Sequence, residues 1–184
     1  TLAKALDYCK QLKKVPIVVN DSRGFFTSRV FETYLYEGFE MLMEGIAPAI
    51  IDNVGRMCSM PRGPLELSDD VAIDLLDRDV PEAGPGGDAV DPRHLELVTR
   101  LVEQEGRFGR KNGKGFYDYP KGAAKRLWAG LAEHFPVTVA RSDEALVTHL
   151  KRRLLYRQAV ESARCLAEGV LTSTHDANIG SIFG

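Results

Sequence analysis

The chain has 184 residues, of which 44% are hydrophobic and 27% are charged, and its formal net charge is -2. This length and composition predict a globular protein with a substantial core, and the balance of 24 basic against 26 acidic residues excludes a general attraction to nucleic acid or an anionic membrane. The sequence contains neither a long apolar run nor a signal peptide, so we predict no membrane insertion and a cytoplasmic location.

The cysteines and histidines do not form a recognisable metal or redox motif. Cys9, Cys58 and Cys165 are far apart in the sequence, lie in apolar stretches and form no CxxC motif. We interpret them as buried thiols in a reducing compartment. The histidines lack ligand spacing to one another or to a cysteine, so no metal site is predicted.

The N-terminal segment combines a predicted helix with a predicted strand. Residues 1–14 have apolar side chains at helical spacing, Pro16 ends this helix, and residues 17–19 form a β-branched run of strand length. One helix and one strand cannot form a sheet that buries both faces. We therefore interpret this segment as the end of an α/β domain whose body lies upstream.

From Gly24 onward the pattern is helical. Apolar residues at three-to-four spacing predict a long, nearly buried helix that ends at Gly45, and Pro48 fits the first turn of a second helix.

A further helix and two loops follow in the middle of the chain. Gly63 and Pro64 open a helix that runs to Leu76. Residues 79–91 are rich in glycine and proline and predict a loop, which leads into another helix. Residues 106–120 form a glycine-rich, basic loop that ends in aromatic residues.

Two stretches of the chain repeat the same pattern. The residues that recur at one constant separation are Arg29, Glu37, Glu44 and Gly45 in the first copy and Arg153, Glu161, Glu168 and Gly169 in the second. Each copy predicts a long helix closed by a glycine and followed by a short helix, and Ser142 fits the N-cap of the second long helix. The second copy stops where the first continues, so we interpret the chain as a fragment of a larger enzyme.

The repeated glutamates lie on helices that are otherwise apolar. A buried glutamate needs a partner, and the arginine eight residues earlier on the same helix is too distant to provide one. We therefore predict an ion pair between the copies, in which Glu37 pairs with Arg153.

Three motifs together resemble a known family. Residues 16–29 (PIVVNDSRGFFTSR) place a glycine-phenylalanine turn before a helix, residues 60–69 (MPRGPLELSD) contain Pro-x-Gly-Pro, and residues 112–119 (NGKGFYDY) form a glycine-aromatic signature. In this order they resemble the C-terminal domain of 3-hydroxyacyl-CoA dehydrogenases. The second copy is similar to the extra C-terminal repeat of the multifunctional fatty-acid oxidation enzymes.

The resemblance implies a fold and a division into domains. It implies a mostly α fold, with a helical domain like the C-terminal domain of 6-phosphogluconate dehydrogenase, half of a second helical repeat, and a remnant helix and strand of a Rossmann domain at the N-terminus. The implied parts are a Rossmann tail, a dehydrogenase C-terminal domain, a linker and a partial second repeat, at residues 1–22, 23–122, 123–141 and 142–184. The two helical units are expected to pack against each other, and a homodimer through the repeats is a further expectation.

The resemblance also implies an activity. It implies an NAD-dependent 3-hydroxyacyl-CoA dehydrogenase of fatty-acid β-oxidation, with an acyl-CoA substrate. In this family the Rossmann domain binds NAD and supplies the histidine base and the glutamate that orients it, and neither residue has a match here. The glycine-rich string at residues 84–89 follows no strand and does not predict a dinucleotide site.

The fragment alone is therefore expected to be inactive and to form one wall of the acyl-CoA cleft and a packing interface. The alternative is a stand-alone helical interaction or dimerisation module without catalysis. The two hypotheses differ in whether a Rossmann domain is encoded upstream.

Three residues are candidates for the site. Ser28 stands where the family has an asparagine beside the reacting oxygen, so the resemblance makes it the catalytic and substrate-binding candidate; alternatively, it bonds locally in the first helical turn. Gly63 and Pro64 are substrate-binding candidates, although a tight turn requires them whatever the substrate.

The basic and aromatic residues of the 106–120 loop have alternative interpretations as well. The basic residues Arg107, Arg110, Lys111 and Lys114 either contact the phosphates of CoA or are solvated. The aromatic residues Phe116, Tyr117 and Tyr119 either anchor the loop in the core, which is the interpretation we favour, or line an acyl pocket.

Overall fold

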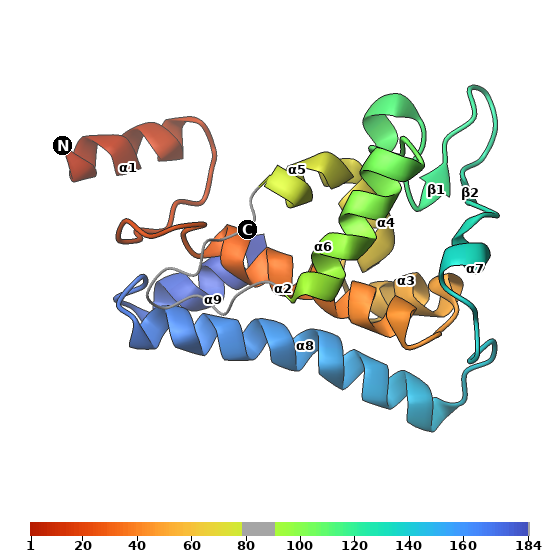
Figure 1. Cartoon of the computed structure of the whole chain (residues 1–184). Helices are drawn as coiled ribbons and strands as arrows, with labels where there is room; N and C mark the ends of the chain where they lie inside the picture. The colour runs from red at the N-terminus through yellow and green to blue at the C-terminus, as the bar shows by residue number, and fades with distance from the viewer. Residues whose placement is uncertain (79–90, 184) are drawn as a thin grey trace. The chain divides into compact units, whose positions relative to one another are not determined.

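The computed structural model describes residues 1–78 and 91–183 (Figure 1). These residues form the mostly helical fold that was predicted. The chain divides into two compact units: unit 1 comprises Thr1–Thr33 and Arg157–Gly184, and unit 2 comprises Tyr34–Tyr156. Helices α2 (Thr27–Met43) and α8 (Glu144–Ala167) each contribute to both units. No helix in the described ranges has the length and hydrophobicity that a membrane span requires.

Unit 1 begins with helix α1 (Leu2–Gln11), which confirms the first predicted helix but buries none of its residues. The prediction of a strand at residues 17–19 is wrong. This segment forms only one isolated antiparallel bridge, between Val19 and Leu171. The segment that Val19 pairs with is short, because helix α9 (Thr174–Phe183) begins soon after Leu171. A single paired residue does not make the ladder of hydrogen bonds that defines a strand.

The core of unit 1 joins both ends of the chain. Its buried members are Phe26, Val30, Cys165, Val170, Leu171 and Ala177. The segment before α2 is tied to the segment after α8 by Asn20, whose backbone N–H donates to the Val170 carbonyl at 2.8 Å and whose side chain donates to the Gly169 carbonyl at 2.7 Å. Residues that are distant in sequence therefore complete this unit.

Unit 2 contains most of the remaining elements (Figure 1). They are α3 (Pro48–Met57), α4 (Pro64–Val71), α5 (Ile73–Arg78), α6 (Pro92–Thr99), a π-helical turn (Arg100–Gln104), a 3-10 turn (Arg110–Asn112), strands β1 (Tyr117–Asp118) and β2 (Arg126–Leu127), and α7 (Leu131–His134). Helix α3 packs on α4, α5 packs on α6, and β1 pairs with β2 in an antiparallel hairpin. The helix starts at Pro48 and Pro64 are confirmed.

Three local expectations need correction or lie outside the described residues. The single helix expected from Pro64 to Leu76 is interrupted at Ala72, whose φ of 86° is incompatible with a continuous right-handed helix. Asp143 rather than Ser142 caps α8, because its Oδ1 accepts the backbone N–H of Leu146 at 2.7 Å. The loop predicted at residues 79–91 lies outside the described residues except for its last residue.

In unit 2 the segment after α2 is tied to the segment before α8. The Gly45 carbonyl accepts the backbone N–H groups of Thr138 and Val139, and Ile46 forms an isolated parallel bridge with Val139. The corresponding segments of unit 1 are joined at Val19 and Leu171. Each unit thus has one isolated bridge between segments that flank the two long helices, parallel in unit 2 and antiparallel in unit 1.

The predicted ion pair between Glu37 and Arg153 is confirmed in unit 2. The Glu37 side chain is only 4% exposed, and its Oε1 lies 2.6 Å from Arg153 Nε. Arg153 also donates from an Nη atom to Glu44 at 2.8 Å. These hydrogen bonds and the charge of Glu37 raise the pKa of Arg153, so the guanidinium stays charged.

Unit 1 contains the corresponding contacts. Arg29 Nε donates to Glu161 at 2.7 Å, and Arg29 Nη1 donates to Glu168 at 2.5 Å. Glu161 is buried, so its carboxylate depends on this arginine for compensation. Each arginine therefore binds two carboxylates of the other copy, which a comparison of the copies in sequence suggested for one pair only.

A double-mutant cycle of Glu37→Gln and Arg153→Met is expected to give a coupling of about 2 kcal/mol, because either single change leaves a poorly solvated charge without its partner. Urea unfolding of the four proteins measures it. The exposed pair Glu96 and Arg100, one helical turn apart at 2.9 Å, is the control, with an expected coupling of about 0.5 kcal/mol or less. Equal coupling in the two cycles would contradict the prediction.

Candidate functional site

Ser28 lies in unit 1, in the first turn of α2, where its side chain is exposed. Immediately before this turn Gly24 and Phe25 both have left-handed φ values, 68° and 50°, and Phe26 is fully buried. The buried ring anchors the turn, so Ser28 is presented to solvent beside the positive end of the helix dipole. A hydroxyl there can donate one hydrogen bond to a ligand oxygen. Its role stays a prediction.

Gly63 and Pro64 lie in unit 2 and are buried. Gly63 is the N-cap of α4, and a Cβ at this position would lie 2.2 Å from Asp52 Cα, so no larger residue fits. Pro64 occupies the first helical position, where its missing N–H is not needed. These observations explain the two residues by packing, and their predicted contact with substrate stays a prediction. They belong to a different unit from Ser28.

The Gly63 turn is held by Asp52, a buried carboxylate that the sequence reading did not single out. Its oxygens accept the backbone N–H groups of Leu65 at 2.9 Å and Glu66 at 3.2 Å, and the Tyr117 hydroxyl at 2.6 Å. Asp52 on α3 therefore caps α4, which has no cap from its own N-cap glycine. An aspartate within an apolar helical stripe is the signal that was available.

Asp69 plays the same part for the glycine-aromatic loop. It is fully buried and accepts the backbone N–H groups of Phe116 at 2.7 Å and Tyr117 at 2.9 Å, and the Tyr119 hydroxyl at 2.9 Å. The prediction that these aromatic residues anchor the loop is confirmed for Phe116, which is 0% exposed, and for Tyr117, which is also buried.

Burial governs the acid-base properties of this network. It raises the pKa of Asp69 to about 7 and raises the pKa of Asp52, in both cases against the effect of the hydrogen bonds that they accept. Burial and the nearby aspartates also raise the pKa of Tyr117 and Tyr119. The tyrosines are therefore neutral donors, and the hydrogen bonds of the network position the α4 turn and the loop.

Neither of the two interpretations of the basic loop residues holds for Arg107. It is 5% exposed rather than solvated, donates to the carbonyls of Gly115 and Tyr117 and to Asp118, and its guanidinium carbon lies 4.2 Å from the centre of the Trp128 ring. This buried arginine fastens the loop to the β1–β2 hairpin, so it is not available to bind the phosphates of CoA.

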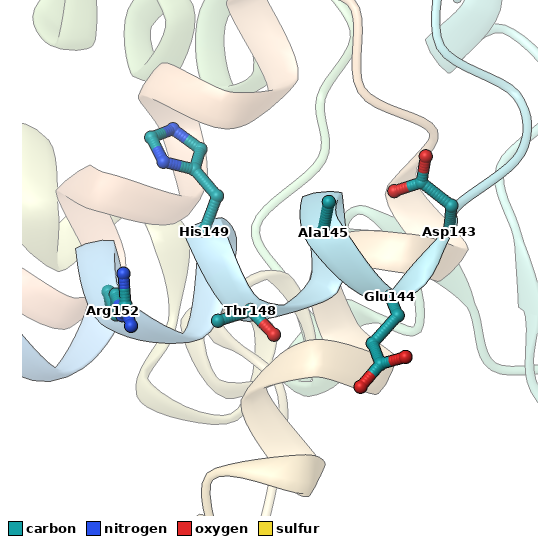
Figure 2. Close-up of a pocket in the computed structure, with 6 residues that line it drawn as sticks. All are labelled: Asp143, Glu144, Ala145, Thr148, His149 and Arg152. Atoms are coloured by element: carbon teal, nitrogen blue, oxygen red, sulfur yellow. The ribbon is translucent and has the colours of Figure 1, made fainter.

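A surface hollow of about 650 Å³ lies along the first turns of α8 (Figure 2). Its lining residues are Asp143, Glu144, Ala145, Thr148, His149 and Arg152. In Figure 2 their side chains point in different directions along one helix and do not converge on a common point. The hollow contains none of the predicted site residues and offers no catalytic arrangement.

The described residues do not form a metal site or a dinucleotide site. Within residues 1–78 and 91–183, no group of three His, Cys, Asp or Glu side chains is placed to hold a metal ion. A dinucleotide site requires a parallel strand that leads through a glycine-rich turn into a helix, whereas the sheet of the described part is a short antiparallel hairpin. These residues do not fit NAD, and the string at residues 84–89 lies outside them.

Comparison with known proteins gives the family. The model of the 3-hydroxyacyl-CoA dehydrogenase C-terminal domain matches residues 24–119, more than half of the chain. The fatty acid oxidation complex subunit alpha of Shewanella amazonensis is 33% identical over 193 residues, and that of Shewanella putrefaciens is 31% identical over 191 residues. Each match covers 100% of this chain and 26% of the relative, so the chain spans about a quarter of the length of these proteins.

A solved structure gives the same result for the fold. The crystal structure of 3-hydroxybutyryl-CoA dehydrogenase from Escherichia coli K12 substr. MG1655 matches with a TM-score of 0.63 at 18% identity, over 95% of this chain and 52% of that chain. This likeness supports the fold, and the domain match supplies the closer relationship. The chain therefore belongs to the 3-hydroxyacyl-CoA dehydrogenase family, whose C-terminal domain it contains at residues 24–119.

Proposed function

We propose that the chain is the C-terminal part of an NAD-dependent 3-hydroxyacyl-CoA dehydrogenase of fatty-acid β-oxidation, in which it forms one wall of the acyl-CoA cleft and a packing interface. The observation that carries the proposal is the domain match over residues 24–119, and the two fatty acid oxidation relatives support it. In this proposal NAD and the catalytic histidine and glutamate belong to a Rossmann domain upstream. A reducing compartment such as the cytoplasm accords with the three free cysteines.

The proposal gives Ser28 and the α4 turn distinct tasks. Ser28 is exposed at a helix N-terminus, where its hydroxyl can donate a hydrogen bond to the 3-oxygen of the substrate. Gly63 and Pro64 shape the cleft wall through the backbone turn that Asp52 holds. The internal repeat supplies the packing interface, through which a homodimer is also proposed.

The test compares three proteins for NADH formation from NAD and a 3-hydroxyacyl-CoA. The purified 184-residue chain is expected to be inactive, a longer protein that includes the upstream domain is expected to be active, and its Ser28→Ala variant is expected to lose about tenfold in kcat/KM through one missing hydrogen bond. Turnover by the chain alone, or none by the longer protein, would contradict the proposal.

A control separates the role of Ser28 from a change in helix stability. Thr33→Ala on the same helix removes a hydroxyl that bonds only locally, to the Val30 carbonyl at 2.6 Å. This variant is expected to leave kcat/KM of the longer protein unchanged. An equal loss of kcat/KM in both variants would favour the alternative, in which Ser28 only forms a local hydrogen bond in the first helical turn.

A further inference from the structure

A cluster of cations surrounds one buried carboxylate in unit 2. This Glu66 cluster consists of Glu66, Asp70, Arg56, Arg62, Arg110 and Lys125. Glu66 lies in the first turn of α4, and its side chain is only 5% exposed. Its carboxylate contacts Arg62 at 2.5 Å, Arg56 at 3.0 Å and Lys125, and Arg110 lies 3.9 Å away.

The charges of this cluster do not cancel. Asp70 is its second carboxylate, and it contacts Nε of Arg62 at 2.5 Å and Nε of Arg110 at 2.6 Å. Four cations therefore share these two carboxylates. Burial raises the pKa of the neighbouring Asp52 and Asp69 and so limits their negative charge, which leaves the surroundings of Glu66 with a net positive charge. The balance at Arg153 is the opposite, because its one guanidinium contacts the two carboxylates of Glu37 and Glu44.

The carboxylate at the centre of the cluster is ionised. Burial acts to raise the pKa of Glu66, but the hydrogen bonds and charges of Lys125 and Arg62 outweigh it, so the pKa lies below the ordinary value. A fixed, ionised carboxylate holds the surrounding cations close together, which mutual repulsion would otherwise oppose.

Two aromatic rings also orient the cations. The Arg110 guanidinium carbon lies 4.9 Å from the centre of the Tyr119 ring, and Lys125 Nζ lies 4.5 Å from that of Tyr117. Both rings are themselves fixed through hydrogen bonds to the buried carboxylates of Asp69 and Asp52. The cations are therefore held in position before any ligand arrives, which reduces the entropy lost on binding.

The same cations remain accessible. The side chains of the four are between 32% and 46% exposed. A guanidinium has five N–H donors, and the contacts of Arg62 and Arg110 with Glu66 and Asp70 use only some of them. Arginine recognises phosphate oxygens through two parallel hydrogen bonds, and the negative charge of a phosphate group complements the net positive charge of the cluster.

We propose that the Glu66 cluster is a binding site for phosphate groups, as presented by pyrophosphate or by the phosphates of a nucleotide. Arg62 and Arg110 contact the phosphate oxygens directly, and the buried Glu66 holds the two guanidinium groups in position. This binding requires neither a 3-hydroxyl substrate nor an upstream domain, so it stands or falls separately from the proposed dehydrogenase activity.

Isothermal titration of the protein with pyrophosphate at constant ionic strength tests the site. Arg62→Gln and Arg110→Gln are each expected to weaken binding at least about tenfold, because each removes one cation and one pair of donors. Arg126→Gln is the matched control, since this arginine is 76% exposed and lies outside the cluster, and it is expected to bind like the unaltered protein. Unaltered binding in both cluster variants, or an equal loss in the control, would overturn the proposal.

Further variants and ligands make the outcome specific. Arg110→Lys keeps the charge but loses the planar fork, so an intermediate affinity is expected, and circular dichroism checks that each variant is folded. If Arg62→Gln does not fold, the Arg110 variants carry the test. Tighter binding of ADP than of pyrophosphate identifies a nucleotide phosphate, tighter binding of pyrophosphate identifies the free anion, and equal binding shows that the shared phosphate groups suffice; each of these outcomes supports the site. If neither ADP nor pyrophosphate binds, the proposal is overturned.

Discussion

Replacing Asp69 by alanine is expected to lower the free energy of unfolding by about 4 kcal/mol at pH 5. The Asp69 oxygens accept two backbone N–H groups and the Tyr119 hydroxyl, and the residue is 0% exposed. Removing the acceptor leaves these donors without partners in the interior, at a cost of about 1–3 kcal/mol for each unsatisfied group. Urea unfolding followed by near-ultraviolet circular dichroism, which reports on the loop tyrosines, measures the loss.

Two further variants separate the hydrogen bonds from general effects of losing an aspartate. At pH 5 the buried Asp69 is protonated, and both of its oxygens can still accept a hydrogen bond. Asp69→Asn keeps one acceptor oxygen but replaces the other with an amide nitrogen that cannot accept, so a smaller loss of about 2–3 kcal/mol is expected. Asp7→Ala removes an exposed aspartate of α1 and is expected to change stability by about 0.5 kcal/mol or less. A loss in Asp69→Ala as small as this control would contradict the role assigned to Asp69.

The pH dependence of the same variant has a definite sign. Burial raises the pKa of Asp69 to about 7, above the value of about 4 expected for an unfolded chain. Because the folded state holds the proton more tightly, the stabilisation from this group is complete below the unfolded pKa and is lost as the pH rises through the folded one. The stability advantage of the unaltered protein over Asp69→Asn is therefore expected to shrink between about pH 4 and pH 7.

Gly109→Ala is expected to cost about 3 kcal/mol. Gly109 has φ 98° and ψ -155°, a conformation that essentially only glycine adopts, and a Cβ there would lie 2.4 Å from the backbone oxygen of Asp69. Backbone cannot yield as a flexible side chain can, so the loop would move off α4 and weaken the hydrogen bonds between Gly109 and Lys114. Thermal or urea unfolding measures the cost.

Gly106→Ala is the matched control for this substitution. Gly106 also has a left-handed φ, 61°, but nothing lies within 4 Å of a Cβ added there. Only the backbone strain remains, with an expected cost of about 1 kcal/mol. Similar costs at the two positions would mean that contact with α4 is not what requires a glycine at position 109.

Helical periodicity and its punctuation were readable from the sequence. Pro48 and Pro64 begin helices where expected, and the long apolar helix that becomes α2 is present. The pairing of Glu37 with Arg153 was also predictable, because a carboxylate on an apolar helix face needs a cation and the repeat placed one candidate opposite it. These inferences depend on near neighbours or on the repeat.

Other features depend on contacts that no local pattern reveals. The donors to Asp69 lie 47 to 50 residues away in sequence, and the Tyr117 hydroxyl lies 65 residues from Asp52. Arg107 resembles a solvated loop residue until its partners at Gly115 and Asp118 are known. Alanine ordinarily favours a helix, so the break at Ala72 is imposed by tertiary packing against local propensity.

The ion pairs of the two long helices constrain the order in which the protein can fold. Arg29 and Glu161 are separated by 132 residues, and Glu37 and Arg153 by 116. During synthesis α2 leaves the ribosome well before α8. Glu37 on α2 therefore has no ion-pair partner until Arg153 on α8 has been translated. Contacts of such long range slow folding, because the entropy of closing the loop is lost before they can form. The nascent chain thus cannot complete either unit until nearly all of this segment has been translated.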